Sequence, residues 1–342
     1  MRRPQWLAAR AVVFAAALAV EIFAAAPCTA GAQGGSIDAQ CGTATLNERV
    51  TQDACQKAID LFQFMAPQLG AALSGGNAVL GEHSALRGFG HFSLGLRANA
   101  VQGRLPRVDE RTPSLTGAVS SSYTTTAEFI PAPVVDAAVG LFRGFPFAGS
   151  YALGVDALVN IAYIPSVDAT GLSVNVPDGS LKFGFGGRLG LLAETFVTPG
   201  ISVTVIRREL PTVNVRGRVS GDDIRVDDVQ VRTTAWRVVA GKNLTVFGLA
   251  VGAGQDSYDT RADAQVTVNR TSPAVTSGVM HARQTLTRTN IFANASLNLA
   301  SARLVAEIGR ASGGTLSTFN TFDAHRADDP RSYASLGLRV SW

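Results

Sequence analysis

The last residues of the chain, RSYASLGLRVSW (331–342), alternate strictly between apolar and polar side chains. Alternation with a period of two is that of a β-strand with one apolar and one polar face. One parity is apolar and holds Ala334, Leu336, Leu338, Val340 and Trp342, whereas the other holds Ser335, Gly337, Arg339 and Ser341. The stretch therefore predicts a strand, and the rest of the chain decides whether that strand belongs to a soluble sandwich or to a membrane barrel.

The same alternation recurs along the chain and gives a count of about ten strands. The nine further segments are 92–100, 135–141, 151–163, 181–191, 201–205, 236–240, 247–251, 291–299 and 304–308. Their connections are alternately long and short, which is typical of barrels with short periplasmic turns and long extracellular loops. We therefore expect an all-β fold, a transmembrane antiparallel β-barrel. The count rises to twelve to fourteen if the polar stretches 115–129, 171–176 and 262–270 are also strands.

The composition agrees with a barrel. Apolar residues make up 46% of the chain, charged residues only 16%, and glycine occurs 35 times. A soluble domain usually carries about a quarter of charged residues. After the leader there is no apolar run of about eighteen residues, so the sequence predicts no transmembrane helix.

Residues 1–32 are typical of a secretory signal peptide. Arg2, Arg3 and Arg10 precede an apolar run at 11–20, and the small triplet at 30–32 predicts cleavage before Gln33. Export favours the outer membrane of a Gram-negative bacterial cell. Loss of the leader lowers the net charge from +4 to about +2, so no nucleic-acid partner is expected.

Two cysteines, Cys41 and Cys55, remain after the leader, because Cys28 lies within it. An even pair in an oxidising compartment predicts a disulfide. A metal pair or a reactive thiol would need neighbouring ligands or bases that the sequence lacks. Phosphate-loop, zinc and calcium-loop motifs are also missing, so we expect no cofactor and no metal.

One convincing helix lies in the segment 33–87. Thr45 and Glu48 have capping-box spacing, and apolar residues then recur at intervals of three and four until Pro67. The glycine-rich stretch 70–81 predicts a flexible lead into a barrel of residues 88–342. The helix is interpreted either as a disulfide-tied periplasmic cap or as a plug. Ten strands favour the cap, because a helix is about 10–12 Å across and a barrel of about eight strands is already filled by side chains.

The residues at the polar positions of the alternating strands are predicted to face the lumen. Its charged members are Arg97, Asp136, Asp156, Lys182, Arg188, Arg237, Arg288, Glu307 and Arg339. Both signs occur, which favours an ion-paired face over a selectivity filter. The excess of arginine would nevertheless make a small pore weakly anion-preferring.

The histidines give little sign of catalysis, so we expect no enzyme. The four histidines are scattered along the chain: His83, His91, His281 and His325. Only His91 falls at a strand position that is predicted to face the lumen. A hydrolase would need a Ser-His or Asp-His constellation near the outer rim. His281 and His325 lie in opposite long loops, with Asp323, Asp328 and Asp329 nearby, and are interpreted as solvated loop residues.

The closing strand resembles that of bacterial outer-membrane β-barrels, whose terminal Phe or Trp belongs to the signal that the insertion machinery recognises. This resemblance implies an insertion signal in Leu336, Leu338, Val340 and Trp342. It also implies two partners, the barrel-insertion machinery and outer-membrane lipid.

Two patches resemble an uncharacterised group of outer-membrane barrels. The first runs from Pro131-Ala132-Pro133 to Gly140-Leu141-Phe142, and the second from Glu194-Thr195-Phe196 to 199–203. More loosely, the order of helix, glycine-rich lead and strands is similar to the hydrophobic-compound transporters, which have an amino-terminal hatch before a fourteen-strand barrel.

The function expected from these features is passive passage of small or hydrophobic solutes, through a narrow porin-like pore or a gated transporter. The alternative is a structural or adhesive barrel whose long extracellular loops bind a partner.

Overall fold

The computed structural model describes residues 35–342 except 43–44, 148, 165, 170–171 and 300, and gives no side-chain surroundings for 167–169 and 172. The predicted signal peptide lies outside the described residues. One long helix, α2 (Leu46–Ser74), precedes the strands, and a short 3-10 helix, η1 (Val108–Glu110), follows the first of them. The strands are β1 (Phe92–Pro106), β2 (Ser122–Tyr123), β3 (Thr125–Phe142), β4 (Phe145–Phe147), β5 (Ser150–Ala152), β6 (Gly154–Tyr163), β7 (Val167–Ala169), β8 (Leu172–Asn175), β9 (Leu181–Leu192), β10 (Gly200–Glu209), β11 (Val213–Val219), β12 (Asp222–Leu244), β13 (Phe247–Val268), β14 (Val275–Thr276), β15 (Met280–Leu299), β16 (Ala302–Ala311), β17 (Thr321–Phe322) and β18 (Arg331–Ser341).

The main sheet contains fourteen strands, more than the ten counted from the apolar alternation. Its order is β14-β13-β15-β16-β18-β1-β3-β6-β9-β10-β12-β11-β8-β7. A further pairing joins β12 to β13 over most of their length, so the ten strands from β13 round to β12 form a ring. The four others, β7, β8, β11 and β14, are short strands outside this ring. Of the polar stretches predicted as further strands, 171–176 contains β8, 262–268 is the end of the ring strand β13, and 115–129 contains β2 and the start of β3.

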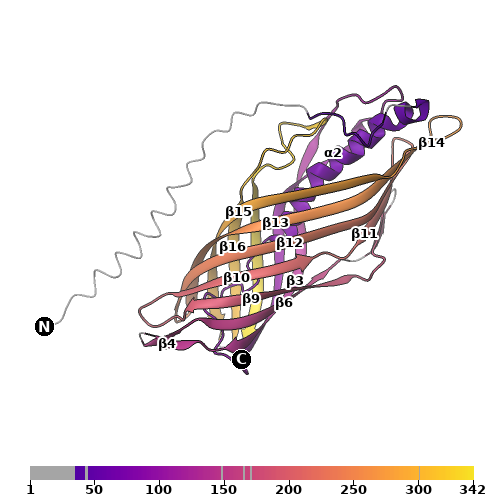
Figure 1. The fold of residues 1–342 in the computed structure, drawn as a ribbon. Helices are drawn as coiled ribbons and strands as arrows, with labels where there is room; N and C mark the ends of the chain where they lie inside the picture. The colour runs from indigo at the N-terminus through magenta and orange to yellow at the C-terminus, as the bar shows by residue number, and fades with distance from the viewer. Residues whose placement is uncertain (1–34, 43–44, 148, 165, 170–171, 300) are drawn as a thin grey trace. The chain divides into compact units, whose positions relative to one another are not determined.

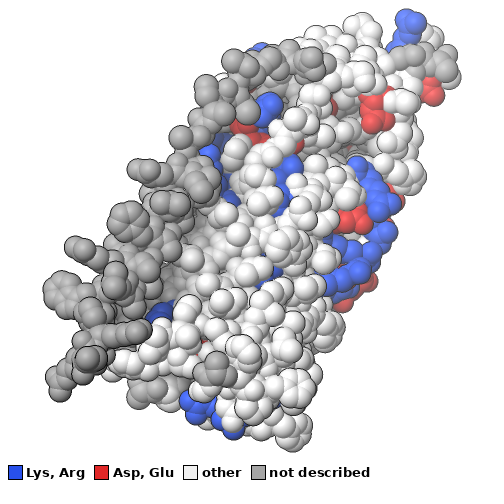
Figure 2. All heavy atoms as spheres, turned by 60° about the vertical axis from the view of Figure 1, so that its left-hand side comes forward, with Lys and Arg blue, Asp and Glu red and all other residues white. Residues whose placement is uncertain are grey.

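At the level of the apolar band, the ring is apolar outside and carries its charged side chains inside. On β18, Leu336 and Leu338 are 57% and 48% exposed, whereas Ser335 and Arg339 are 4% and 3% exposed. An apolar outer band over a polar interior is the arrangement of transmembrane β-barrels, whose outer face contacts lipid. Figure 2 shows a broad surface that carries few charged side chains, with charged residues beyond it. The predicted fold class, an antiparallel outer-membrane barrel, is confirmed.

Three strands extend far past the lipid-facing band. β12, β13 and β15 have 23, 22 and 20 residues. At about 3.3 Å per residue each spans more than 60 Å, against an apolar band about 25 Å tall. These parts were predicted to be loops, because their outward residues are polar and the apolar–polar alternation is lost.

The helix begins as predicted but ends later. Thr45 and Glu48 form the capping box, each binding the other's backbone N–H. The predicted stop at Pro67 is wrong, because α2 continues to Ser74. A proline leaves the carbonyl four residues before it without a helical donor, and here Gln284 Nε2 of β15 donates to that group, the Gln63 carbonyl, at 3.2 Å.

The last turns of α2 lie inside the ring. Ala71 and Ala72 pack in one buried cluster with Val101, Val239 and Tyr258, which come from three different strands. In Figure 1 the helix starts at the end of the ring opposite to the C-terminus and runs in among the strands. The interpretation as a cap on the short-turn rim is therefore wrong.

Small residues explain how a ten-strand ring admits a helix. A Cβ added at Gly70 would lie 2.6 Å from Tyr258 Cγ, so only glycine allows this approach. Alanines occupy the next two positions of the helix. Within the described residues, no helix is both long enough and apolar enough to cross a membrane by itself.

Candidate functional site

Three arginines from three strands meet the carboxyl end of α2. Arg97 Nη1 of β1 donates to the Gly75 carbonyl at 2.5 Å. Arg208 Nη1 of β10 and Arg237 Nη2 of β12 donate to the Ser74 carbonyl at 3.0 and 2.6 Å. All three arginines are at most 3% exposed. We call Arg97, Arg208 and Arg237 the arginine clamp.

The clamp satisfies groups that a helix end cannot satisfy by itself. The last carbonyls of a helix lack helical donors and carry the negative end of its dipole. The last turn of α2 contains no basic residue of its own. The ring supplies the missing positive charge, and Asn99 Nδ2 adds a 2.6 Å hydrogen bond to the Gly75 carbonyl.

Carboxylates on neighbouring strands balance two members of the clamp. Arg97 Nε lies 2.8 Å from Asp136 Oδ2, and Arg237 Nη2 lies 3.3 Å from Asp256 Oδ2. Arg208 donates to the Leu73 and Ser74 carbonyls, and no carboxylate lies within salt-bridge distance of it among the described residues. Arg208 therefore depends most directly on the helix end.

After the helix, residues 75–87 run through the lumen as an irregular segment with a turn at 78–81, which we call the strap. Asn77 N donates to Glu307 Oε1 at 2.9 Å, and Leu86 N lies 3.1 Å from both oxygens of Asp156. Glu82 Oε2 lies 3.1 Å from Arg188 Nη2 and 3.2 Å from Arg339 Nη1. The strap thus makes polar contacts with β6, β9, β16 and β18.

Inward-facing glycines make room for the strap. A Cβ added at Gly190 would lie 2.7 Å from the Ala85 Cβ, and one at Gly337 would lie 2.8 Å from Leu80 Cδ2. Both distances are shorter than carbon atoms tolerate, so larger residues here would displace the strap. Part of the high glycine content is therefore explained by the lumen.

A polar cluster holds the strap at the short-turn end. His83 Nε2 lies 2.8 Å from Glu194 Oε2, and Asn243 donates to both oxygens of the same carboxylate, from its backbone N at 2.6 Å and from Nδ2 at 2.8 Å. Burial by itself raises the pKa of Glu194, but the hydrogen bonds from His83 and Asn243 outweigh it and lower that pKa below its ordinary 4.5. Glu194 therefore remains a charged acceptor at neutral pH.

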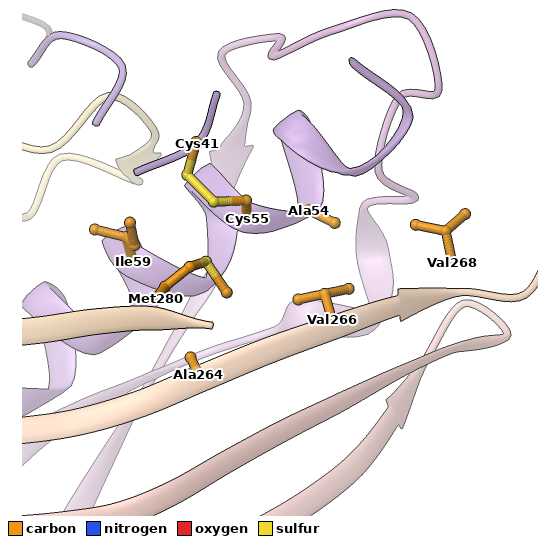
Figure 3. Close-up of a cluster of buried hydrophobic side chains, with 8 residues drawn as sticks. All are labelled: Cys41, Ala54, Cys55, Ile59, Ala264, Val266, Val268 and Met280. Carbon is orange, nitrogen blue, oxygen red and sulfur yellow. A yellow bond between two sulfur atoms is a disulfide. The ribbon is translucent and has the colours of Figure 1, made fainter. Parts of the chain in front are cut away.

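The first half of α2 packs at the other end, among the long connections. The disulfide between Cys41 and Cys55 is present and lies in a buried cluster with Ala264, Val266 and Met280 (Figure 3). These three residues belong to the ends of β13 and β15 that extend beyond the lipid band. The start of the helix, with its disulfide, thus lies at the long-connection end, not at the short-turn end.

Two buried carboxylates of α2 fix the loops around it. Asp53 accepts from Ser114 N at 2.6 Å and Val119 N at 2.9 Å. Asp60 accepts from Asn320 N at 2.8 Å and Nδ2 at 2.6 Å. Burial raises the pKa of Asp60, although the hydrogen bonds from Asn320 and Phe319 oppose the shift. The loops are thereby fixed to the helix rather than free in solvent.

The charged residues predicted for the lumen lie on the inner side of the ring. Eight of them are at most 8% exposed, and the ninth, Lys182, is partly exposed. The structure brings together Arg97 with Asp136, Arg188 with Asp156, and Arg339 and Arg188 with Glu82 of the strap. Arg288 instead pairs with Asp328 in the last long connection, at 3.2 Å.

Arg208, Asp256 and Glu82 were not predicted from the sequence as residues of the lumen. Arg208 and Asp256 continue the inward-facing positions of β10 and β13 beyond 205 and 251, where the apolar alternation ends. Glu82 lies in the strap, whose path through the ring has no signal in the sequence.

The remaining predicted residues lie in separate places. Trp342 stacks on Phe92 with ring centroids 4.7 Å apart, where β1 and β18 close the ring. His281 Nδ1 contacts Asp263 at 2.7 Å and is largely exposed, whereas His325 Nδ1 contacts Asp329 at 3.3 Å. Among the described residues, no group of three or more His, Cys, Asp or Glu side chains is arranged to hold a metal ion.

No protein-family model matches the chain, and no curated protein matches it. Among solved structures, it is similar to the translocator domain of the autotransporter NalP from Neisseria meningitidis, with 10% identity and a TM-score of 0.36 over 87% of this chain and 99% of that one. It is also similar to the toluene transporter TodX of Pseudomonas putida, with 11% identity and a TM-score of 0.26 over 79% and 96%. Ail, the attachment invasion locus protein of Yersinia pestis, has 8% identity and a TM-score of 0.28 over 74% and 99%. All three are outer-membrane β-barrels, the class to which the ring and its apolar outer face assign this chain.

Proposed function

We propose that this protein is a gated channel of the outer membrane, in which the end of α2 and the strap form the plug. The observation that carries the proposal is the arginine clamp, which binds the plug from three sides of the ring. A permanently open pore would not contain a segment that fills its lumen.

The chemistry of the contacts favours a plug that moves. Between the strap and the ring, many contacts are hydrogen bonds and ion pairs, such as those of Asn77, Glu82 and Leu86. Beside them lies one apolar cluster, in which Ala78 and Val79 pack against the ring. Polar groups separated from each other can bind water instead, which limits the net cost of separating them to about 1.5–3 kcal/mol for each hydrogen bond to a charged group. An apolar interface of the same extent would be more costly to expose.

The charges favour small anions as the solute. When the plug leaves, the Glu82 carboxylate and the helix carbonyls leave with it. Arg188, Arg208 and Arg339 then face the lumen without the partners that the plug supplies. A hydrophobic solute, the other expectation from the sequence, fits this charged inner face poorly.

The proposal is tested by measuring solute flux through the ring when the plug is joined to it by a disulfide. Gly70 and Tyr258 lie close enough for a disulfide in the double variant Gly70→Cys/Tyr258→Cys, because the Cβ atoms would be about 3.0 Å apart and a small shift reaches the usual 3.5–4.5 Å. In proteoliposomes, we expect the reduced form to admit a small organic anion faster than a neutral sugar of equal size, and the oxidised form to admit neither.

The parent chain under the same reductant is the control for loss of the native disulfide. Equal flux in the oxidised and reduced forms, or no flux in the reduced form, would contradict a plug-gated channel.

A second candidate, binding of a partner by the long connections, has one observation in its favour. The loops at that end form an ordered surface, since Phe64 and Tyr123 stack on Phe322 with ring centroids 4.1 and 5.7 Å apart. Deletion of residues 313–318 would abolish adhesion of expressing cells to a surface if the loops bind a partner, and would leave it unchanged if they do not.

A further inference from the structure

The outer face of the ring carries paired arginines beyond the lipid-facing band. Arg216 of β11 stands directly opposite Arg225 of β12, and Arg261 of β13 stands opposite Arg283 of β15. All four are exposed. Like charges directly opposite each other across two strands are destabilising, so two such pairs on one face need a compensating feature.

A third pair lies next to these two. Arg207 Nη2 and Arg232 Nε lie 3.3 and 3.2 Å from the same oxygen of Glu209. One carboxylate therefore forms ion pairs with two guanidinium groups, and the two arginine side chains are 60% and 38% exposed. We call these six residues the arginine face.

Neighbouring carboxylates only partly neutralise the arginine face. Arg225 contacts Asp227, and Arg283 Nη2 lies 3.2 Å from Asp259 Oδ2. Arg261 instead contacts a neutral partner, since its Nε and Nη2 lie 3.1 and 2.6 Å from Gln230 Oε1. Exposed guanidinium groups in pairs are suited to a phosphate, because each binds two of its oxygens.

The position of the arginine face indicates that the phosphate belongs to a membrane lipid. Arg207 follows the exposed Val205 on the same side of β10, and Arg232 lies four residues beyond the exposed Trp236 on β12. Four residues cover about 13 Å along a strand, or about 10 Å of height at the usual barrel tilt. Arg207 and Arg232 therefore stand just beyond the apolar band and point sideways, toward lipid headgroups. The two opposed pairs lie further along the strands on the same outward side. Figure 2 shows charged side chains gathered beyond the uncharged part of the surface.

We propose that the arginine face binds phosphate groups of the membrane leaflet at the long-connection end, those of its phosphorylated glycolipid. Each arginine pair bridges one phosphate, which relieves the repulsion between the two guanidinium groups. The lipid is bound on the outside of the ring, so this site is independent of the plug and of what passes through the lumen.

Binding of purified lipopolysaccharide to the full chain in detergent tests the proposal. The test variant changes all six residues of the arginine face to Gln. A matched control changes Arg143 and Arg310 to Gln, since both are exposed and lie outside the arginine face. Heat-modifiable migration in gels checks that every variant is folded.

We expect the test variant to lose at least tenfold in affinity for lipopolysaccharide and the control to match the parent chain. Dephosphorylated lipopolysaccharide should bind the parent as weakly as the intact glycolipid binds the test variant. Titration with phosphatidylglycerol and with inorganic phosphate distinguishes the glycolipid from other phosphate sources, and equal affinity for either would overturn the assignment to the glycolipid. Unchanged binding in the test variant, or binding of a sulfated polysaccharide but not of lipopolysaccharide, would overturn the proposal.

Discussion

Arg237 Nη2 donates a 2.6 Å hydrogen bond to the carbonyl oxygen of Ser74, a residue 163 positions earlier in the chain. This bond joins the inner face of β12 to the end of the only long helix among the described residues. Arg97 and Arg208 meet the same helix end from β1 and β10. The helix is thus held in the lumen by the ring itself, and the account of the protein as a gated channel depends on these contacts.

Replacing Arg208 by Met should loosen the plug. Hydrogen bonds that involve a charged group contribute about 1.5–3 kcal/mol, so the open fraction should rise by about tenfold or more. Arg208 suits this test because no carboxylate within salt-bridge distance would be left buried and unpaired among the described residues. Single-channel recording measures the open fraction, and Arg207→Met, on the outer face of the same strand, is the control. An unchanged open fraction in Arg208→Met would contradict the role of the clamp.

Replacing Gly190 by Val should expel the strap. The new Cβ would lie 2.7 Å from that of Ala85, whereas a Cβ at Gly187 has its nearest neighbour at 3.6 Å. A cysteine introduced at Leu80, which is 4% exposed, should react with a maleimide at least tenfold faster in Gly190→Val than in Gly187→Val. Equal protection in both would mean that the strap is held by other contacts.

The start of the helix should be accessible from outside the cell. Leu46 is 81% exposed at the long-connection end, and Val197 is 77% exposed in a short turn. On intact cells, a membrane-impermeant maleimide should label Leu46→Cys but should label Val197→Cys only after permeabilisation. Ala274→Cys, in a long connection, serves as a positive control. The reverse pattern would place the long connections in the periplasm.

Acid should release the strap from the short-turn end. Because hydrogen bonds hold the pKa of folded Glu194 below 4.5, this carboxylate contributes stability above that pH, and the contribution is lost as the pH falls through the folded pKa. The apparent melting temperature of Glu194→Gln should be lower than that of the parent at pH 7, and the difference should shrink as the pH falls below 4.5. Asp178→Asn, at an exposed turn, should show no such change. A difference that persists in acid would contradict this role of Glu194.

The alternation of side chains predicted the membrane-facing part of each ring strand, because lipid and lumen impose opposite polarity on successive residues. Leu336 and Arg339 on β18 illustrate this. This alternation is absent where both faces of a strand are polar. The extended parts of β12, β13 and β15 were therefore predicted to be loops. Arg208 and Asp256 were missed for the same reason.

The position of the helix could not be predicted, because it depends on contacts between residues far apart in the chain. Pro67 predicted a helix end, and only the Gln284 side chain, from β15, explains why the helix continues. The width of an average helix, compared with the lumen of a ten-strand barrel, favoured a cap over a plug. Gly70 and the two alanines after it, however, reduce the diameter of this helix where it enters the ring. The disulfide between Cys41 and Cys55 was predicted from the number of cysteines, and the structure contains it.

Single-channel conductance of the full chain in planar bilayers, compared with a variant that lacks residues 35–87, the helix and the strap, tests the central claim most directly. The account predicts that the full chain is closed most of the time, and that the deletion variant shows steady openings with a preference for anions. Steady openings of equal conductance in both would contradict it, because the helix would then leave the path of ions free.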